Sequence, residues 1–229
     1  MYSTNYIIGF VVAMTSLVAV SLTTLREVTK DQALLNEAIF NKRSILKAVN
    51  NHLGEKGVDD LSDEEVLNIF DNQIKQTAIN VKGDKVESTD IIASGYKTGK
   101  VEDIDMAKEK KKSDKDMILP LYTYTANGKT FYILSVRGSG LWDEIWGCVA
   151  LEDDLNTVVG ASFDHKGETP GLGAEIKDNP VFAKNFANTK IYDEKGNYKS
   201  IKVRKGGAKA STKLMDCLVL PLLVMVYQK

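Results

Sequence analysis

Residues 165–176 read His165-Lys166-Gly167-Glu168-Thr169-Pro170-Gly171-Leu172-Gly173-Ala174-Glu175-Ile176. The stretch places three glycines and one proline in a turn between a strand-like run and an expected helix. Glycine allows positive φ and lets another group approach the backbone closely, while Pro170 fixes φ and stiffens the turn. The pattern is consistent with a tight loop between two elements. It is equally consistent with one wall of a site for a flat ligand, to which Glu168 and Thr169 offer polar groups.

A second glycine-containing segment lies upstream and reads Gly138-Ser139-Gly140-Leu141-Trp142-Asp143-Glu144-Ile145-Trp146-Gly147. Its Gly-x-Gly-Leu-Trp pattern, followed by the Gly-Glu-Thr-Pro-Gly-Leu-Gly-x-x-Ile turn, resembles the bacterial FMN-binding domains. With the apolar N-terminus and the run Lys205-Gly206-Gly207-Ala208, the chain is similar to the NqrC family of the sodium-translocating NADH:quinone reductases. The resemblance covers nearly the whole length and is strongest from Phe131 to Ala208.

The resemblance implies an α+β fold, an antiparallel sheet with flanking helices, that binds FMN. Thr169 is implied to hydrogen-bond the flavin, and Leu141 and Trp142 to pack beside its ring. The implied cofactor-binding residues from the two segments are Leu141, Trp142, Glu168, Thr169, Leu172 and Gly173. In this family the FMN phosphate is also esterified to a threonine of a Ser-Gly-Ala/Gly-Thr-x-Thr-Ser motif by a separate flavin transferase.

The attachment motif is not intact in this chain. The run that ends at Ala208 is followed at once by Lys209-Ala210-Ser211-Thr212-Lys213, and no Ser-Gly-x-Thr string occurs in the sequence. Thr212 is the remaining candidate for attachment. Either the chain lacks the attachment loop and binds FMN weakly or not at all, or the sequence is closed up across residues missing from it.

The N-terminus predicts a membrane anchor. Residues 6–22 contain no charged side chain, and no ionisable side chain other than Tyr precedes Arg26, so the apolar span approaches bilayer length. A cleaved signal peptide is the alternative, but residues 1–5 lack the basic residues that it requires. We therefore expect an anchor and juxtamembrane segment over 1–29 and a domain over 30–229. The family's arrangement implies a single pass through the bacterial inner membrane with the domain in the periplasm.

Hydrophobic periodicity predicts an amphipathic helix over 30–53. A second helix begins after Ser62, whose spacing to Glu65 is that of a capping box, and Ile74 is expected at its far end. Residues 108–116 are read as a solvated loop, with contact to anionic lipid as the alternative.

Turn signals at Asn127-Gly128 and Lys195-Gly196-Asn197 predict two hairpins. Expected strands cover 118–125, 130–137, 147–151, 157–163, 190–193 and 199–204, and an expected short helix covers 180–187. Together these elements predict an antiparallel sheet with helices at its ends or face, an α+β domain. Trp146 and Cys148 are expected in its core.

Composition excludes several functions. The net charge of −1 gives no case for nucleic acid, and Cys148 and Cys217 do not form a metal motif. Only two histidines, His52 and His165, are present, and Gly138-Ser139-Gly140 does not continue into a dinucleotide fingerprint. We therefore predict no metal site, no NADH site and no complete catalytic site on this chain alone.

The resulting prediction is a membrane-anchored flavoprotein that relays electrons within a sodium-translocating NADH:quinone (ubiquinone) oxidoreductase. Its implied partners are the other subunits of that complex, the flavin transferase and the membrane. One alternative is the corresponding RnfG-like protein of the related Rnf electron-transport complex. Another is a flavin-free scaffold or assembly protein that has kept the fold and lost the cofactor.

Overall fold

The computed structural model describes residues 2–54 and 56–198. The chain divides into two compact units, Met1–Asn41 and Lys42–Lys229. The expected strand over 199–204, the Lys205–Ala208 run, Thr212 and Cys217 lie outside the described residues. The domain limits expected from the sequence, 1–29 and 30–229, stay a prediction.

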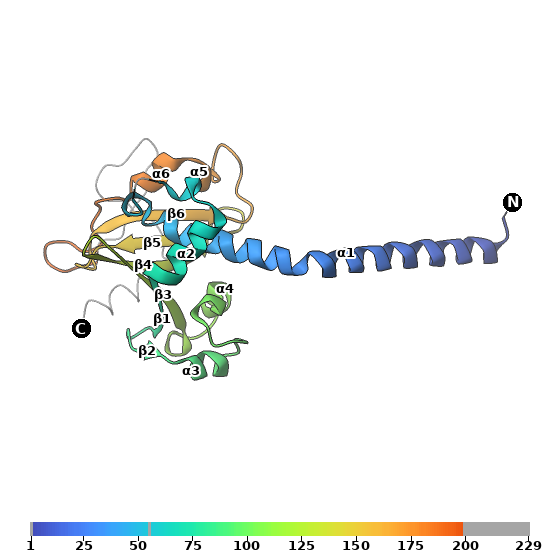
Figure 1. Ribbon diagram of the computed structural model, residues 1–229, viewed down its shortest axis with the longest axis horizontal. Helices are drawn as coiled ribbons and strands as arrows, with labels where there is room; N and C mark the ends of the chain where they lie inside the picture. The colour runs from blue at the N-terminus through green and yellow to red at the C-terminus, as the bar shows by residue number, and fades with distance from the viewer. Residues whose placement is uncertain (1, 55, 199–229) are drawn as a thin grey trace. The chain divides into compact units, whose positions relative to one another are not determined.

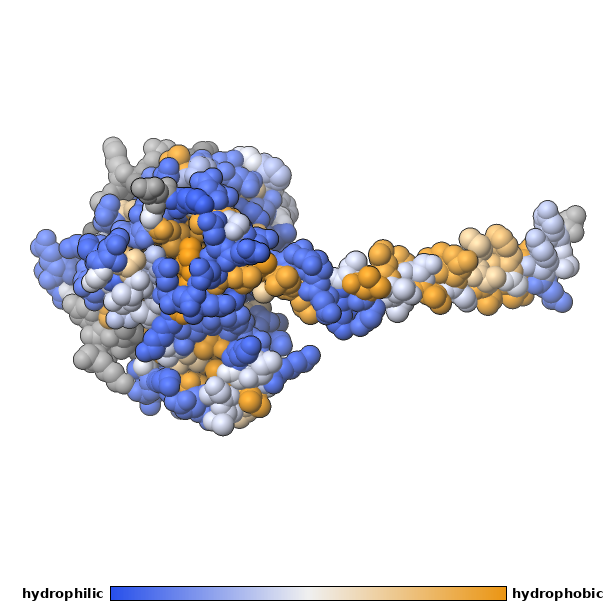
Figure 2. Space-filling model, viewed as in Figure 1, coloured by the Kyte–Doolittle hydropathy of each residue, from blue (hydrophilic) through white to orange (hydrophobic). Residues whose placement is uncertain are grey.

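One helix, α1 (Thr4–Lys47), contains the whole apolar N-terminal run and continues into the amphipathic stretch (Figure 1). Within the described residues it is the one helix long and apolar enough to cross a membrane, and Figure 2 shows apolar residues along its N-terminal part. The Thr15 and Thr23 hydroxyls donate to the carbonyls of Val11 and Ala19, each at 2.8 Å. These bonds satisfy polar groups that an apolar surrounding would leave without water.

The end of α1 differs from the expectation of a helix reaching residue 53. The helix ends at Lys47, and Asn50–His52 form a short 3-10 turn instead. The His52 ring lies 4.4 Å from the Phe131 ring, and the His52 carbonyl accepts a hydrogen bond from Tyr124. Packing against the sheet thus redirects a stretch whose local pattern is helical.

Six strands form one antiparallel sheet in the order β2-β1-β3-β4-β5-β6. Their bounds are β1 Ile74–Asn80, β2 Lys85–Val86, β3 Ile118–Ala126, β4 Lys129–Ser139, β5 Glu144–Leu151 and β6 Val158–His165. The hairpin predicted at Asn127-Gly128 is confirmed, since both residues have positive φ, 51° and 74°, as a two-residue turn of this type requires. The α+β fold class is therefore confirmed.

Short helices complete the domain: α2 Asp63–Gln73, α3 Ser88–Ala93, α4 Met106–Glu109, α5 Glu175–Asp178 and α6 Pro180–Lys184. Further 3-10 turns cover Val58–Asp60, Val101–Asp103 and Asp114–Asp116. The placement of Ile74 on the second helix is wrong, because Ile74 has extended backbone angles and opens β1. Strand β1 itself was not expected from the sequence.

Both faces of the sheet are covered, because successive side chains of a strand point to opposite sides. On one face Phe70 of α2 packs on Tyr122, and the Ser162 hydroxyl donates to the Ser44 carbonyl in the last turns of α1 at 2.6 Å. The opposite face forms a core cluster with α4 and α6. It includes Met106, Leu119, Leu134, Val136, Ala161, Phe163 and Phe186.

The expectation of a solvated loop over 108–116 is wrong in one respect. Glu109 closes α4 and is fully buried. Its carboxylate accepts hydrogen bonds from the Tyr96 hydroxyl and, at 2.7 Å, from the Ile118 amide, and it pairs with Lys112 at 2.7 Å. The charged run therefore contains an internal polar anchor that its composition does not distinguish from its exposed neighbours.

The capping box predicted at the start of α2 is confirmed. The Ser62 hydroxyl accepts from the Glu65 amide at 3.2 Å, and the Glu65 carboxylate accepts from the Ser62 amide at 2.7 Å. A hydrogen bond from Lys56, together with that from the Ser62 amide, lowers the pKa of Glu65 from its ordinary 4.5 to about 2.

This lowered pKa gives a prediction about pH. A carboxylate whose folded pKa is depressed stabilises the fold above its ordinary pKa, and the contribution is lost as the pH falls through the folded value. Glu65→Gln keeps the capping geometry but removes the charge. We expect the free energy of unfolding of this variant to fall below the wild-type value above pH 4.5, and the difference to shrink as the pH approaches 2. Urea titrations at stepped pH measure it, and a pH-independent difference would contradict it.

Candidate functional site

The first of the two segments is the connection between β4 and β5. Its ends are fixed by the paired residues Ser139 and Glu144, and the Gly140 amide closes the connection by donating to the Asp143 carbonyl at 2.7 Å. Leu141 and Trp142 therefore lie at the tip of a tight loop, where they are 83% and 70% exposed.

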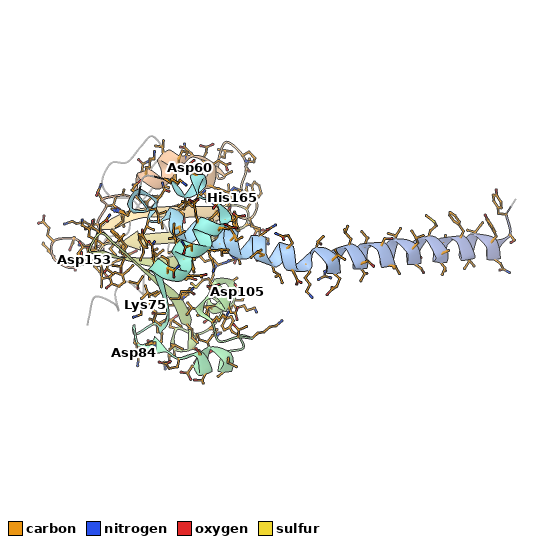
Figure 3. All side chains as sticks on the ribbon, viewed as in Figure 1. Asp60, Lys75, Asp84, Asp105, Asp153 and His165 are labelled. Atoms are coloured by element: carbon orange, nitrogen blue, oxygen red, sulfur yellow. The ribbon has the colours of Figure 1, made fainter. Side chains whose placement is uncertain are left out.

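The second segment follows β6, whose last residue His165 is labelled in Figure 3. The Leu172 amide donates to the Thr169 carbonyl at 3.1 Å, with Pro170 and Gly171 as the two central residues. Gly171 has a φ of 74°, which this turn requires at its third position. Proline and glycine thus have the places that a type II turn assigns to them, and the turn leads directly into α5 as the sequence predicted.

The sheet brings the two segments together. Ile145 and His165 are paired across β5 and β6, and the Lys166 amide continues the ladder by donating to the Glu144 carbonyl at 3.0 Å. The Glu168 carboxylate then accepts a hydrogen bond from the Trp142 amide at 3.1 Å. Stretches 26 residues apart in the chain therefore share a direct contact.

Glu168 occupies the space between the segments. It is only 7% exposed, although its neighbours Thr169 and Pro170 are exposed. A methyl group placed on either Gly140 or Gly173 would overlap its carboxylate. The sequence suggested that the glycines make room for a flat ligand, whereas at these two positions the room is taken by Glu168. Nothing in the local sequence shows that this carboxylate is buried.

Ion pairs surround the two segments. Lys166 pairs with Asp143 at 3.2 Å, and Arg137 pairs with Glu144. The Glu144 amide and then Lys166 hold the pKa of Asp143 below its ordinary value, and Arg137 does the same for the pKa of Glu144. These carboxylates are therefore ionised at neutral pH, and their charges are largely offset by their partners.

The sequence predicted Trp146 in the core, and this prediction is wrong. The side chain is half-buried on β5. The Arg137 guanidinium lies 5.2 Å from its ring, an arrangement typical of a cation–π contact. Trp146 therefore packs against Arg137, which is itself ion-paired with Glu144, and not against the apolar core.

The prediction for Cys148 is confirmed, since the side chain is buried in β5. Burial raises the pKa of its thiol to about 12, so the group is inert at neutral pH. Among residues 2–54 and 56–198, no group of three or more His, Cys, Asp or Glu side chains is arranged to hold a metal ion.

An exposed apolar group remains at the site. Leu141, Trp142 and Leu172 are among the most exposed large apolar side chains outside α1, the last at 73%. Exposed apolar side chains gathered on joined loops are typical of a binding site. With the exposed Thr169 beside them, they offer aromatic and aliphatic surfaces and one hydroxyl, which suit a flat, partly polar ring such as a flavin.

The six implied residues that the structure describes lie on two segments that contact each other. The seventh candidate, Thr212, lies outside the described residues. The structural roles of Gly140 and His165 at this site were not predicted from the sequence. Gly140 makes room for Glu168, and the Nδ1 atom of His165 accepts a hydrogen bond from the Glu168 amide at 3.2 Å. The glycine at position 140 was a visible signal for a close approach, but it did not show which group approaches.

Comparison with known proteins assigns a class to this arrangement. Residues 140–213 match the family model described as an FMN-binding domain, and the match includes both segments. The fold and the site therefore define a chain with an FMN-binding domain.

Solved structures and curated relatives give the family. The structure of the NqrC protein of the Na(+)-translocating NADH-quinone reductase from Parabacteroides distasonis is 30% identical, with a TM-score of 0.63 and coverage of 82% of each chain. The Shewanella oneidensis NqrC structure, at 23% identity and a TM-score of 0.60, shares the fold over 77% of this chain and 81% of that one.

Among curated proteins, the NqrC protein of this reductase from Pseudomonas aeruginosa is 32% identical over 75% of this chain. The Vibrio campbellii NqrC protein is 48% identical over 33% of it. The matched stretches span 66% and 28% of the lengths of these relatives. The chain belongs to the NqrC family of the Na(+)-translocating NADH-quinone reductases.

Proposed function

We propose that this chain is a membrane-anchored flavoprotein that relays electrons, as one of several subunits, within a Na(+)-translocating NADH:quinone oxidoreductase. Support comes from membership of the NqrC family, from the FMN-binding domain match over 140–213 and from the apolar N-terminal helix. The observation that carries the proposal is the contact between the Trp142 amide and the Glu168 carboxylate, which joins the two segments that carry three exposed apolar side chains.

In this proposal the flavin ring lies against Trp142, Leu141 and Leu172. These side chains shield it from water, and the Thr169 hydroxyl binds a polar edge. FMN supplies the redox chemistry, because a flavin accepts and releases electrons singly. The protein contributes binding, orientation and the surroundings that favour one redox state over another.

The other subunits of the complex, the flavin transferase and the inner membrane are the proposed partners, and the domain is proposed to be periplasmic. The Rnf-type alternative is not favoured, because the relatives described above are NqrC proteins of the NADH-quinone reductase. A flavin-free scaffold remains the second candidate, since the sequence lacks a Ser-Gly-x-Thr string for attachment.

Intact mass spectrometry of the full-length chain, co-expressed with the flavin transferase, tests the proposal. A mass increase of one FMN less one water, absent from the Thr212→Ala variant, supports covalent attachment at Thr212. Flavin that copurifies with the native protein but separates on denaturation supports non-covalent binding. Protein that contains no flavin and does not bind added FMN would overturn the proposal in favour of the scaffold.

A further inference from the structure

The Glu168 carboxylate is the buried polar group of the candidate site. It is 7% exposed, whereas Leu141, Trp142 and Leu172 around it are each at least 70% exposed. A carboxylate withdrawn from water must be compensated by hydrogen bonds. Part of that compensation is the Trp142 amide, at 3.1 Å.

Both segments are shaped around this carboxylate. Gly140, in the loop before Trp142, and Gly173, in the turn after Leu172, each lie so close to it that a side chain at either position would overlap it. The Glu168 backbone is fixed as well, because its amide donates to the His165 ring at 3.2 Å. The carboxylate therefore lies between the Gly140 loop and the Gly173 turn and contacts both.

The backbone bond from the Lys166 amide to the Glu144 carbonyl joins the strand ends of the two segments. The exposed side-chain link between them is weaker than the Glu168 contact. The Asp143–Lys166 pair is 3.2 Å long, but its side chains are 37% and 65% exposed. Exposed ion pairs contribute little, because water and salt screen them. Beyond the strand ends, the buried contact of Glu168 is therefore the stronger of the two side-chain contacts between the Trp142 loop and the glycine turn.

We propose that Glu168 is a positioning residue, which acts on the flavin through Trp142. Its carboxylate holds the Trp142 loop at a fixed distance from the Leu172 turn and so preforms the apolar surface of Trp142 and Leu172 against which the flavin ring lies. The flavin part of this inference rests on the proposed function, whereas the clamp between the loops does not.

The test measures the clamp without flavin. The full-length chain in detergent is labelled with 15N-tryptophan, and because it contains two tryptophans, Trp146→Phe assigns the Trp142 amide signal. Hydrogen exchange of the Trp142 amide is then followed by NMR. Glu168→Ala removes the acceptor and should accelerate this exchange about tenfold, as expected for loss of one hydrogen bond to a carboxylate.

Two variants control for shape and for loss of folding. Glu168→Gln keeps an acceptor oxygen and should leave the exchange rate within about threefold of wild type. Gly173→Ala keeps Glu168 but places a methyl group against its carboxylate, so it should accelerate exchange as Glu168→Ala does. Ile92→Ala, an exposed change on α3 outside the two segments, should leave the rate unchanged.

FMN titration of the same flavin-free proteins supplies the second measurement. Glu168→Ala should weaken binding about tenfold, and Glu168→Gln should restore most of the affinity. Weakened binding with unchanged Trp142 exchange would overturn the inference, since it would make Glu168 a direct ligand. If wild type does not bind FMN, the proposed function fails, while the exchange data still decide the clamp.

Discussion

Trp142→Ala should weaken FMN binding about 10- to 100-fold, the largest functional effect expected for a single change in this chain. Stacking of a planar base on an aromatic side chain is worth roughly 1–3 kcal/mol by alanine substitution, and a flavin ring presents a comparable face. Because the Trp142 side chain is 70% exposed, its removal should have little effect on the stability of the fold. Titration of the flavin-free full-length chain with FMN, followed by flavin fluorescence, measures the change.

The matched control is Ile92→Ala. Ile92 is also a large exposed apolar residue, at 51%, but it lies on α3, in the part of the domain that packs with β1 and β2. Its replacement should leave FMN affinity unchanged. Equal affinities for wild type and the Trp142 variant would place the flavin away from the loop between β4 and β5.

Glu109→Ala should lower the free energy of unfolding by about 3 kcal/mol. The fully buried carboxylate accepts hydrogen bonds from the Tyr96 hydroxyl and the Ile118 amide. Its removal leaves both donors without this acceptor, and a buried unsatisfied donor costs about 1–3 kcal/mol. Lys112, whose side chain is 26% exposed, can turn toward water and adds less.

Urea unfolding followed by tryptophan fluorescence measures this loss, because Trp142 and Trp146 both lie in the unit that begins at Lys42. Glu109→Gln, which keeps one acceptor oxygen, should lose less stability. Lys111→Ala, an exposed change in the same charged run, should stay within about 0.5 kcal/mol of wild type. An equally small loss for Glu109→Ala would show that the buried network is not a stabilising element.

Local signals in the sequence predict three features that depend on local geometry. Asn127-Gly128 makes a two-residue hairpin because both positions require positive φ. Ser62 and Glu65 form a capping box because the side chain of the cap reaches the amide three residues further along the chain, and the side chain at that position reaches back to the amide of the cap. Pro170 and Gly171 form the turn that their own φ preferences favour. The strand expected over 190–193 is not formed, since only isolated bridges occur there, and the helix expected over 180–187 ends at Lys184.

The predictions that are wrong concern residues whose structure depends on contacts with distant parts of the chain. Ile74 was placed on a helix by its spacing, but pairing with Tyr124 of β3 makes it the start of a strand. The helix over 30–53 ends early because His52 packs on Phe131, and Trp146 is held at the surface by Arg137. Each of these outcomes depends on a partner that periodicity does not identify.

The amino-acid pattern was enough to predict the apolar helix, the antiparallel α+β domain, the two motif segments and their resemblance to the FMN-binding domains. The burial of Glu168 and of Glu109, whose neighbours Asp114 and Asp116 in the charged run are exposed, follows from the three-dimensional packing. The physical reason is that burial is a property of the whole packing. The pairing of β5 with β6 encloses the space that Glu168 fills, and the approach of α4 to β3 encloses the one that Glu109 fills.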